Sequence, residues 1–311
     1  MTQHMNGVIV PLLTTLKEDG RFDEQSQRHL VENLVERGIT TFFAFGYSGE
    51  YKFLPFDVRM AAMKGVAGIV KELKLASGED VTLVMGVNGK NIAEVATYST
   101  YVNKLGVDGL VLQPSSVPHS HQDSMRILRN NAPGKPFYLY VNPETAIDGN
   151  ETLPPTTINA FRIWPEFAGV KVTTNIDSFH DYAGALYNSS RGLYIGSALD
   201  MFKIDFTNTA DLEEKLPDGV ITCPGNIFPE HWLKAWIMRE GTLDTLARLH
   251  SKFVEYENIW KGLPSGRCDI ASAKNHLVRN GIIASDFNYA KKLTSEDRVY
   301  LDQQYEYFSM D

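Results

Sequence analysis

The stretch GVIVPLLTTLKEDGRFDEQSQRHLVENLVERGITTFFAF, residues 7–45, contains two apolar runs on either side of an amphipathic segment. Residues 7–13 and 40–45 are almost continuously apolar, as is typical of parallel strands that are covered on both faces. Between them, apolar residues recur at helical spacing and Gly38 provides a stop signal. This stretch therefore predicts one strand–helix–strand unit.

The same pattern continues along the chain. Helical patterns also occur at 91–106 and 177–192, each ending on a glycine. Strands are predicted at 7–13, 40–45, 81–87, 109–113, 137–141, 168–172, 192–196 and 219–223. Eight strands with helices in most of the gaps predict an α/β fold, a (β/α)8 TIM barrel. An open doubly wound sheet is the alternative, but no GxGxxG motif follows the first strand.

Strand signals stop near residue 226. The segments at 230–241, 243–262, 270–281 and 295–308 all have helical patterns. We therefore expect a catalytic barrel over residues 1–225 and a helical C-terminal region over residues 226–311.

Composition limits the partners and the compartment. The net charge of −8 would repel a phosphate backbone, so we expect no nucleic-acid partner. No segment approaches the length of a membrane span, and the N-terminus lacks a basic signal-peptide start. Two cysteines, Cys223 and Cys268, form neither a disulfide framework nor a thiolate metal site. We expect a cytoplasmic protein.

Lys171 lies within the predicted strand AGVKV, residues 168–172. Burial of an ammonium ion is costly unless the ion is paired or loses its proton. The nearest acid along the chain is Glu166. Lys171 is therefore either a nucleophilic amine, or a structural lysine that reaches the strand end or pairs with a distant acid.

Other polar residues follow the predicted strands, where barrel enzymes hold their chemistry. The second strand is followed by GYSGE, residues 46–50, and the fifth by YVNP, residues 140–143, with Tyr140 inside the strand. The seventh leads into GSALD, residues 196–200. A glycine-rich turn such as 46–50 can orient backbone N–H groups toward a carboxylate.

In order along the chain, five stretches resemble the dihydrodipicolinate synthase / N-acetylneuraminate lyase family of class I pyruvate-dependent lyases. They are GVIVPLLTTLKEDGRFD, GYSGE, KPFYLYVNP, FAGVKVTT and GVITCPGNIFPE. Each motif alone is weak, but their order and spacing together are specific. The resemblance covers the barrel and part of the C-terminal helices.

The resemblance implies a class I aldolase or lyase that joins pyruvate to an aldehyde or cleaves a 2-keto-3-deoxy sugar acid. Lys171 is then the Schiff-base lysine, and Tyr140 is the proton donor and acceptor. An apolar strand would favour the neutral amine that the chemistry needs. The substrate-binding residues implied are Gly46, Tyr47, Ser48, Thr173 and Gly196. We expect no cofactor and no metal, and the resemblance implies a homo-oligomer, a dimer of dimers.

Each of these residues also has a structural interpretation. Tyr140 could be a core tyrosine, the 46–50 loop a plain turn, and Thr173 a residue chosen for β-propensity. Glu50 is expected to fix the loop in place. His119 and His121 have no third metal ligand nearby, which favours a solvated loop.

Departures from the family pattern bear on the substrate. The synthase branch has a tyrosine where this chain has Ser115 or Ser116, and an arginine that is missing from NPETAIDGN. The sialic-acid branch has acidic residues where this chain has Ala198 and Leu199. Tyr47 stands where the family usually has serine or threonine. Three alternatives remain: 4-hydroxy-tetrahydrodipicolinate synthase, a decarboxylating dehydratase of a deoxy-oxo-sugar diacid, and a non-catalytic barrel that binds a small carboxylate.

Overall fold

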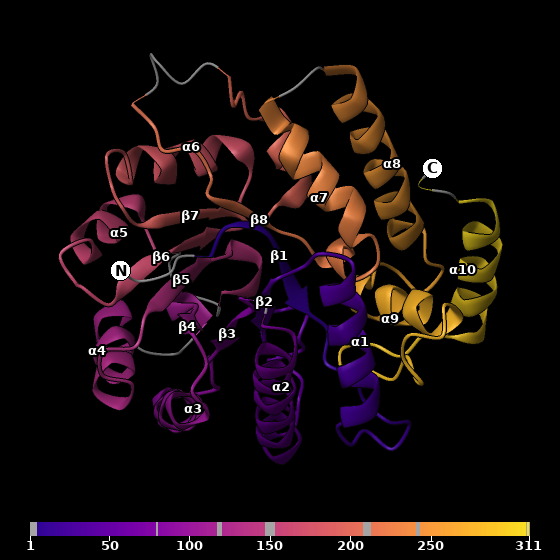
Figure 1. The fold of residues 1–311 in the computed structure, drawn as a ribbon, viewed down its shortest axis with the longest axis horizontal. Helices are drawn as coiled ribbons and strands as arrows, with labels where there is room; N and C mark the ends of the chain where they lie inside the picture. Colours follow the sequence, from indigo (N-terminus) through magenta and orange to yellow (C-terminus); the bar gives the residue numbers. More distant parts are fainter. Residues whose placement is uncertain are drawn as a thin grey trace.

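The computed structural model describes residues 5–78, 80–116, 120–146, 153–207, 213–240, 243–308 and 310. Eight parallel strands form a closed barrel in which each strand pairs with the next along the chain (Figure 1). The strands are β1(Gly7–Leu12), β2(Thr41–Ala44), β3(Thr82–Gly86), β4(Gly109–Leu112), β5(Phe137–Val141), β6(Phe167–Val172), β7(Gly192–Ile195) and β8(Gly219–Ile221). All eight predicted strands are confirmed, within one or two residues at each end.

Closure of the barrel is given by the pairing of its first and last strands. Val8 of β1 lies opposite Val220 of β8, and Ile9 lies opposite Ile221. An open sheet would leave two unpaired edges, so the open doubly wound alternative is wrong.

Helices alternate with most of the strands. The connection from β7 to β8 differs, because its described part carries the 3-10 helix η3(Ala198–Lys203). The α-helices are α1(Glu24–Glu36), α2(Phe56–Ser77), α3(Ile92–Leu105), α4(His121–Asn131), α5(Pro155–Phe161), α6(Ile176–Ala185), α7(Pro229–Ile237), α8(Leu243–Lys261), α9(Asp269–Arg279) and α10(Ser295–Tyr307).

Helix α1 shows how local sequence sets an element. The Asp23 side chain caps its first turn by accepting a hydrogen bond from the Ser26 N–H, and Leu30, Val31 and Leu34 are buried. Gly38 follows with φ of +90°, a conformation that favours glycine. The predicted helix and its glycine stop are confirmed.

Helix α6 corrects one prediction. The pattern at 177–192 predicts a helix that runs to a glycine, whereas α6 ends at Ala185 with Leu186 as its C-cap. The segment YNSSRG that follows competes with helical hydrogen bonding: Asn188 takes φ of +55°, and the Ser189 hydroxyl accepts from the Arg191 N–H at 3.1 Å.

The N-terminal end of the barrel is closed by tyrosine side chains and the segment before β1. The Tyr194 hydroxyl donates to the Met5 carbonyl at 3.0 Å, and the Met5 N–H donates to the Tyr138 hydroxyl at 3.4 Å. Burial raises the pKa of Tyr138 to about 12, so this hydroxyl stays neutral. Among the described residues, these side chains therefore fill the barrel interior at this end.

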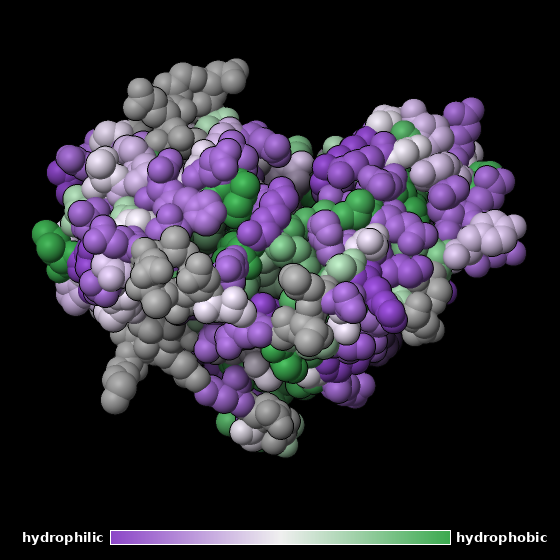
Figure 2. Space-filling view, turned by 90° about the horizontal axis from the view of Figure 1, so that it is seen from above, coloured by the Kyte–Doolittle hydropathy of each residue, from purple (hydrophilic) through white to green (hydrophobic). Residues whose placement is uncertain are grey.

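The C-terminal helices α8, α9 and α10 lie together on one side of the barrel (Figure 1). Trp232 of α7 stacks on Phe253 of α8, with ring centroids 4.1 Å apart. Hydrophilic residues cover most of the face seen in Figure 2, and hydrophobic residues gather in the hollow near its middle. The division of the chain at residue 225 remains our proposal. Within the described ranges, no helix is long and apolar enough to cross a membrane.

Candidate active site

A cavity of about 770 Å³ opens at the C-terminal ends of the strands. That volume suits a small-molecule ligand. It brings together six of the seven residues predicted from the sequence: Tyr47, Ser48, Tyr140, Lys171, Thr173 and Gly196. Gly46 is outside the lining; a Cβ atom there would lie 2.7 Å from the Phe43 ring, so this glycine makes room for a core side chain.

Lys171 and Tyr140 are neighbours inside the barrel. The strand register places Tyr140 of β5 opposite Lys171 of β6. The Lys171 Nζ atom lies 4.1 Å from the centroid of the Tyr140 ring and 5.2 Å from that of Phe43. Lys171 is 7% exposed and Tyr140 is 3% exposed. Among the described residues Lys171 takes part in no ion pair, so its amine has only aromatic rings and the cavity around it.

Gly196 leaves the space that the lysine occupies. A Cβ atom at this position would lie 2.0 Å from Thr173 Oγ1 and 2.8 Å from Lys171 Cε. Thr173 lines the cavity, and its hydroxyl is buried without a hydrogen-bond partner among the described residues. A buried hydroxyl without a partner is costly, so a ligand hydroxyl is a suitable partner for it.

Gly196→Ala is expected to slow imine formation at Lys171 by roughly 10²-fold, because the new methyl group displaces the lysine side chain from its position. The rate of borohydride trapping with a 2-oxo acid measures this. Gly68→Ala is the matched control, since a Cβ atom at Gly68 would meet nothing within 4 Å. An unchanged trapping rate in Gly196→Ala would show that the lysine does not depend on this space.

The 46–50 loop between β2 and α2 is tightly folded. Its flanking residues Phe45 and Glu50 have φ of +57° and +63°. A Cβ atom at Gly49 would lie 2.7 Å from the Phe45 backbone nitrogen, so only glycine fits there. This conformation turns Tyr47 and Ser48 into the cavity lining.

Glu50 anchors the loop to the C-terminal region. Its side chain and that of Lys274 of α9 are both fully buried, and their charged atoms are 2.5 Å apart. The other carboxylate oxygen of Glu50 accepts from the Tyr289 N–H at 2.7 Å. The expectation that Glu50 holds the loop in place is confirmed.

Cys223, which follows β8, also lines the cavity. Burial raises the pKa of its thiol to about 12, although a hydrogen bond with the Ser48 side chain acts in the opposite direction. The thiol is therefore protonated at neutral pH and is a poor nucleophile. Lys171 is the better candidate for covalent chemistry in this cavity.

The C-terminal region supplies one wall of the cavity, which the sequence did not predict. Glu257 and Trp260 come from α8, Arg267 and Asp269 from the start of α9, and Lys291 from the segment before α10. No sequence motif marks these residues, because only the packing of α8 and α9 brings them to the barrel mouth.

The cations of this wall are already bound. Arg267 donates from Nε and Nη2 to the two carboxylate oxygens of Asp269, both at 2.6 Å, and these bonds raise the pKa of Arg267 above its ordinary value. The Lys291 ammonium donates to the carbonyls of Ser265 and Gly266. The charge of Arg267 is thus neutralised by Asp269, whereas Lys291 keeps its charge because it donates to neutral carbonyls.

The histidine pair of the sequence does not contribute to the cavity as described. His119 lies outside the described residues, and His121, the first residue of α4, is not part of the lining. In the described ranges, no group of three or more His, Cys, Asp or Glu side chains could hold a metal ion.

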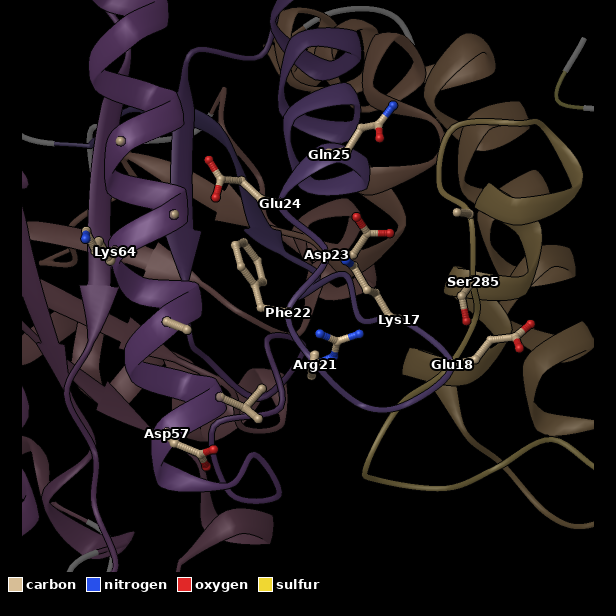
Figure 3. A pocket seen from close by; sticks show the side chains of 15 residues that line it. Lys17, Glu18, Arg21, Phe22, Asp23, Glu24, Gln25, Asp57, Lys64 and Ser285 are labelled. Carbon is tan, nitrogen blue, oxygen red and sulfur yellow. The ribbon is translucent and has the colours of Figure 1, made fainter.

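A larger groove of about 1030 Å³ lies elsewhere, between the start of α1 and α2 (Figure 3). Its lining mixes both charges: Arg21 pairs with Asp19, and Asp23 caps α1. The Phe22 ring packs directly against Gly65, in the space that the Cβ atom of any other residue would fill. Arg21 and Asp23 are thus used in local structure, and the barrel-mouth cavity, which contains the buried Lys171, is the better candidate site.

Comparisons with known proteins agree with this geometry. A sequence model described as the Dihydrodipicolinate synthetase family matches residues 4–260. The "Putative 2-dehydro-3-deoxy-D-gluconate aldolase YagE" of Escherichia coli is 24% identical over 261 residues, 82% of this chain and 81% of that protein. The structure of YagE in complex with pyruvate superposes with a TM-score of 0.81 at 20% identity, over 98% of this chain and 99% of the other.

Two further solved structures have the same fold. Dihydrodipicolinate synthase from Bacteroides thetaiotaomicron gives a TM-score of 0.83 at 21% identity, covering 97% of this chain and 98% of that one. A catalytic lysine mutant of the Ruminococcus gnavus sialic acid aldolase gives 0.82 at 16% identity, covering 97% and 94%.

A closed barrel whose open mouth holds a buried lysine, unpaired among the described residues, is the arrangement that an enzyme of the lysine Schiff-base class needs. The chain belongs to the dihydrodipicolinate synthetase family. It is accordingly a carbon–carbon lyase.

Proposed function

We propose that Lys171 forms a Schiff base with the keto carbon of pyruvate or another 2-oxo acid, and that the enzyme makes or cleaves the carbon–carbon bond to an aldehyde. The observation that carries this proposal is the burial of the Lys171 amine against Tyr140 in the cavity, without an acid partner among the described residues. The pyruvate complex of YagE supports the choice of 2-oxo acid.

The proposed mechanism uses the two side chains in turn. The neutral amine adds to the ketone, and the Tyr140 hydroxyl gives its proton to the departing hydroxide, which leaves as water. This yields the Tyr140 phenolate and an iminium that accepts electrons from the adjacent carbon–carbon bond. In cleavage, the substrate hydroxyl gives its proton to the Tyr140 oxygen as the bond breaks and the aldehyde leaves. In the direction of synthesis, the same oxygen returns the proton to the new hydroxyl.

Ser48 is proposed to bind the carboxylate of the 2-oxo acid. Ser48 lines the cavity, where its side chain lowers the pKa of the neighbouring Cys223 thiol against the effect of burial. Backbone N–H groups of the loop add further donors of the kind that bind small anions.

Ser48→Ala is expected to weaken pyruvate binding by roughly 2- to 13-fold, because one neutral hydrogen bond is worth ~0.5–1.5 kcal/mol. Pyruvate titration by calorimetry measures the change. Ser124→Ala is the control, since the Ser124 hydroxyl is buried in α4 without a partner among the described residues. Equal affinity of Ser48→Ala and wild type would place the carboxylate elsewhere.

The aldehyde half is proposed to be an uncharged, hydroxyl-bearing group, so that the substrate is a 2-keto-3-deoxy sugar acid. In the described part of the cavity wall, Arg267 is already paired with Asp269, and Lys291 donates to two backbone carbonyls. The Thr173 hydroxyl, which has no partner among the described residues, suits a substrate hydroxyl. A second carboxylate, as in a sugar diacid or the second substrate of the synthase, would share the cavity with the carboxylates of Glu144, Glu257 and Asp269, which repel it.

A panel assay tests this assignment. Wild-type enzyme is incubated with 2-keto-3-deoxy sugar acids, with a deoxy-oxo-sugar diacid, and with pyruvate plus aspartate semialdehyde, and pyruvate release or consumption is followed. Release from the monoacids supports the proposal. Reaction with the diacid or the semialdehyde alone would assign one of the other two enzymes, and no imine with any 2-oxo acid would leave only the binding protein.

We also propose a homo-oligomer, a dimer of dimers. Tyr47 and Phe53 form a partly exposed aromatic pair at the cavity, with ring centroids 6.5 Å apart, which suits burial against a second copy of the chain. Light scattering at micromolar concentration should give four times the mass of the chain, and a monomer would contradict the proposal.

A cytoplasmic setting remains our proposal as well. Cys223 and Cys268 are both free, as expected in a reducing compartment.

A further inference from the structure

Asn142, two residues after Tyr140, contacts the reactive phenol directly. Its Nδ2 atom donates to the Tyr140 hydroxyl at 2.9 Å. In the described part of the chain, the Tyr140 hydroxyl makes no other hydrogen bond. It is the acceptor in this one. Asn142 is 5% exposed and lines the cavity. The phenolic proton is therefore free to interact with groups in the cavity.

Asn142 is itself held from two sides. Its Oδ1 atom accepts from the Glu144 N–H at 3.1 Å, and its backbone carbonyl accepts from Gln113 Nε2 at 2.9 Å. Gln113 is fully buried and also bonds the hydroxyls of Thr145, at 2.8 Å, and Tyr51, at 3.2 Å. The amide of Asn142 thus has one orientation, with its donor toward Tyr140.

The serines at the position of the family's relay tyrosine hydrogen-bond to the buried Gln113 and Asn88. The Ser116 hydroxyl donates to the Gln113 carbonyl at 2.9 Å and accepts from Asn88 Nδ2. The Ser115 hydroxyl accepts from Gln113 Nε2 at 3.4 Å. In the described part of the chain, the hydrogen-bond donor to the phenol is therefore an amide. The titratable groups that face Tyr140 from other elements are Lys171, Tyr47 and Tyr51, which stay unchanged in the variants below.

We propose that Asn142 is a positioning residue that orients the Tyr140 hydroxyl toward Lys171 and stabilises the phenolate during proton transfer. This inference rests on the proposed function. An N–H donor to a phenolic oxygen becomes a stronger, charge-assisted bond when that oxygen loses its proton. Asn142 cannot give up a proton itself, so it supports Tyr140 without extending the proton relay.

Asn142→Asp separates this role from a structural one. An aspartate keeps the oxygen that accepts from the Glu144 N–H, but it loses the donor to Tyr140 and puts a negative charge beside the phenolate. We expect kcat to fall by about 10- to 150-fold, the loss of one hydrogen bond to a charged group. The ascending limb of the pH–rate profile should move to higher pH, a change that a loss of stability alone would not cause.

Two controls accompany this variant. Asn91→Asp makes the same chemical change at the cap of α3, where Oδ1 accepts from the Glu94 N–H at 3.0 Å, and it should leave the pH profile unchanged. In a Tyr140→Phe background, Asn142→Asp should cause no further loss, because it acts through the phenol.

The outcomes distinguish this inference from the proposed function. If the wild type shows neither borohydride trapping nor turnover, the proposed function is overturned. If the wild type turns over but Asn142→Asp has the same pH profile, only the role of Asn142 is overturned. A test without substrate uses NMR of protein labelled at tyrosine Cζ, with the Tyr140 signal assigned from the Tyr140→Phe variant. The Tyr140 signal should titrate at higher pH in Asn142→Asp than in the wild type. An unshifted titration would overturn the inference.

Discussion

Replacement of Lys171 by alanine is expected to abolish both imine formation and turnover while the barrel stays folded. In the wild type, borohydride with pyruvate should reduce the iminium and add one reduced pyruvyl group per chain, which peptide mapping should place on Lys171. The Lys171→Ala variant should give no adduct. The fold should survive, because the removed amine is buried and makes no ion pair with the described residues.

Three variants make this result specific. Lys171→Arg should also fail, since a guanidinium stays charged and cannot form the imine. Lys291→Ala removes another lysine of the same cavity and should keep the adduct. Tyr140→Phe should still be trapped but turn over slowly, because it loses proton transfer and keeps the nucleophile. An adduct on any other lysine would remove the main support of the proposed function.

Lys274→Ala is expected to lower the free energy of unfolding by about 3–5 kcal/mol, because it leaves the Glu50 carboxylate buried without its partner. The Lys274 ammonium also donates to the Phe287 carbonyl at 2.8 Å, which would lose this bond too. Urea unfolding measures the loss. Pyruvate affinity should fall as well, since Glu50 ends the loop that carries Ser48.

The double variant Glu50→Gln with Lys274→Met is the control for the buried charge. It removes both charges and keeps similar side-chain volumes, so it should be less destabilised than the sum of the two single variants. A Lys274→Ala variant as stable as the wild type would show that water reaches Glu50, contrary to the burial seen here.

The fold could be predicted because its signals are local and repeated. Each strand is a short apolar run, and helices such as α1 carry their own cap and stop. The end of α6 was predicted wrongly because Gly192 was read as its stop, whereas the segment from Asn188 to Ser189 ends it earlier. A glycine reports a helix end only when no nearer residue competes for the backbone.

Some residues of the candidate site could likewise be predicted from the sequence, and others could not. Lys171 and Tyr140 could be found because each stands out within its own strand, and parallel register then places them side by side. Glu257 and Lys274 could not be found, because they lie within ordinary helices, and Arg267 could not be found, because it lies in the connection before α9 without a motif. The role of Asn142 was hidden for another reason: its contact with Tyr140 depends on the turn that follows β5.

The anchoring of Glu50 by Lys274 also sets an order for biosynthesis. Proteins emerge from the ribosome N-terminus first, so all eight strands leave the tunnel before α9 does. A nascent chain that has completed β8 therefore carries Lys171, Tyr140 and Ser48 but lacks the lysine to which the Ser48 loop is tied. The binding site should mature only after α9 has docked, and a chaperone that delays this docking would delay activity without affecting the barrel.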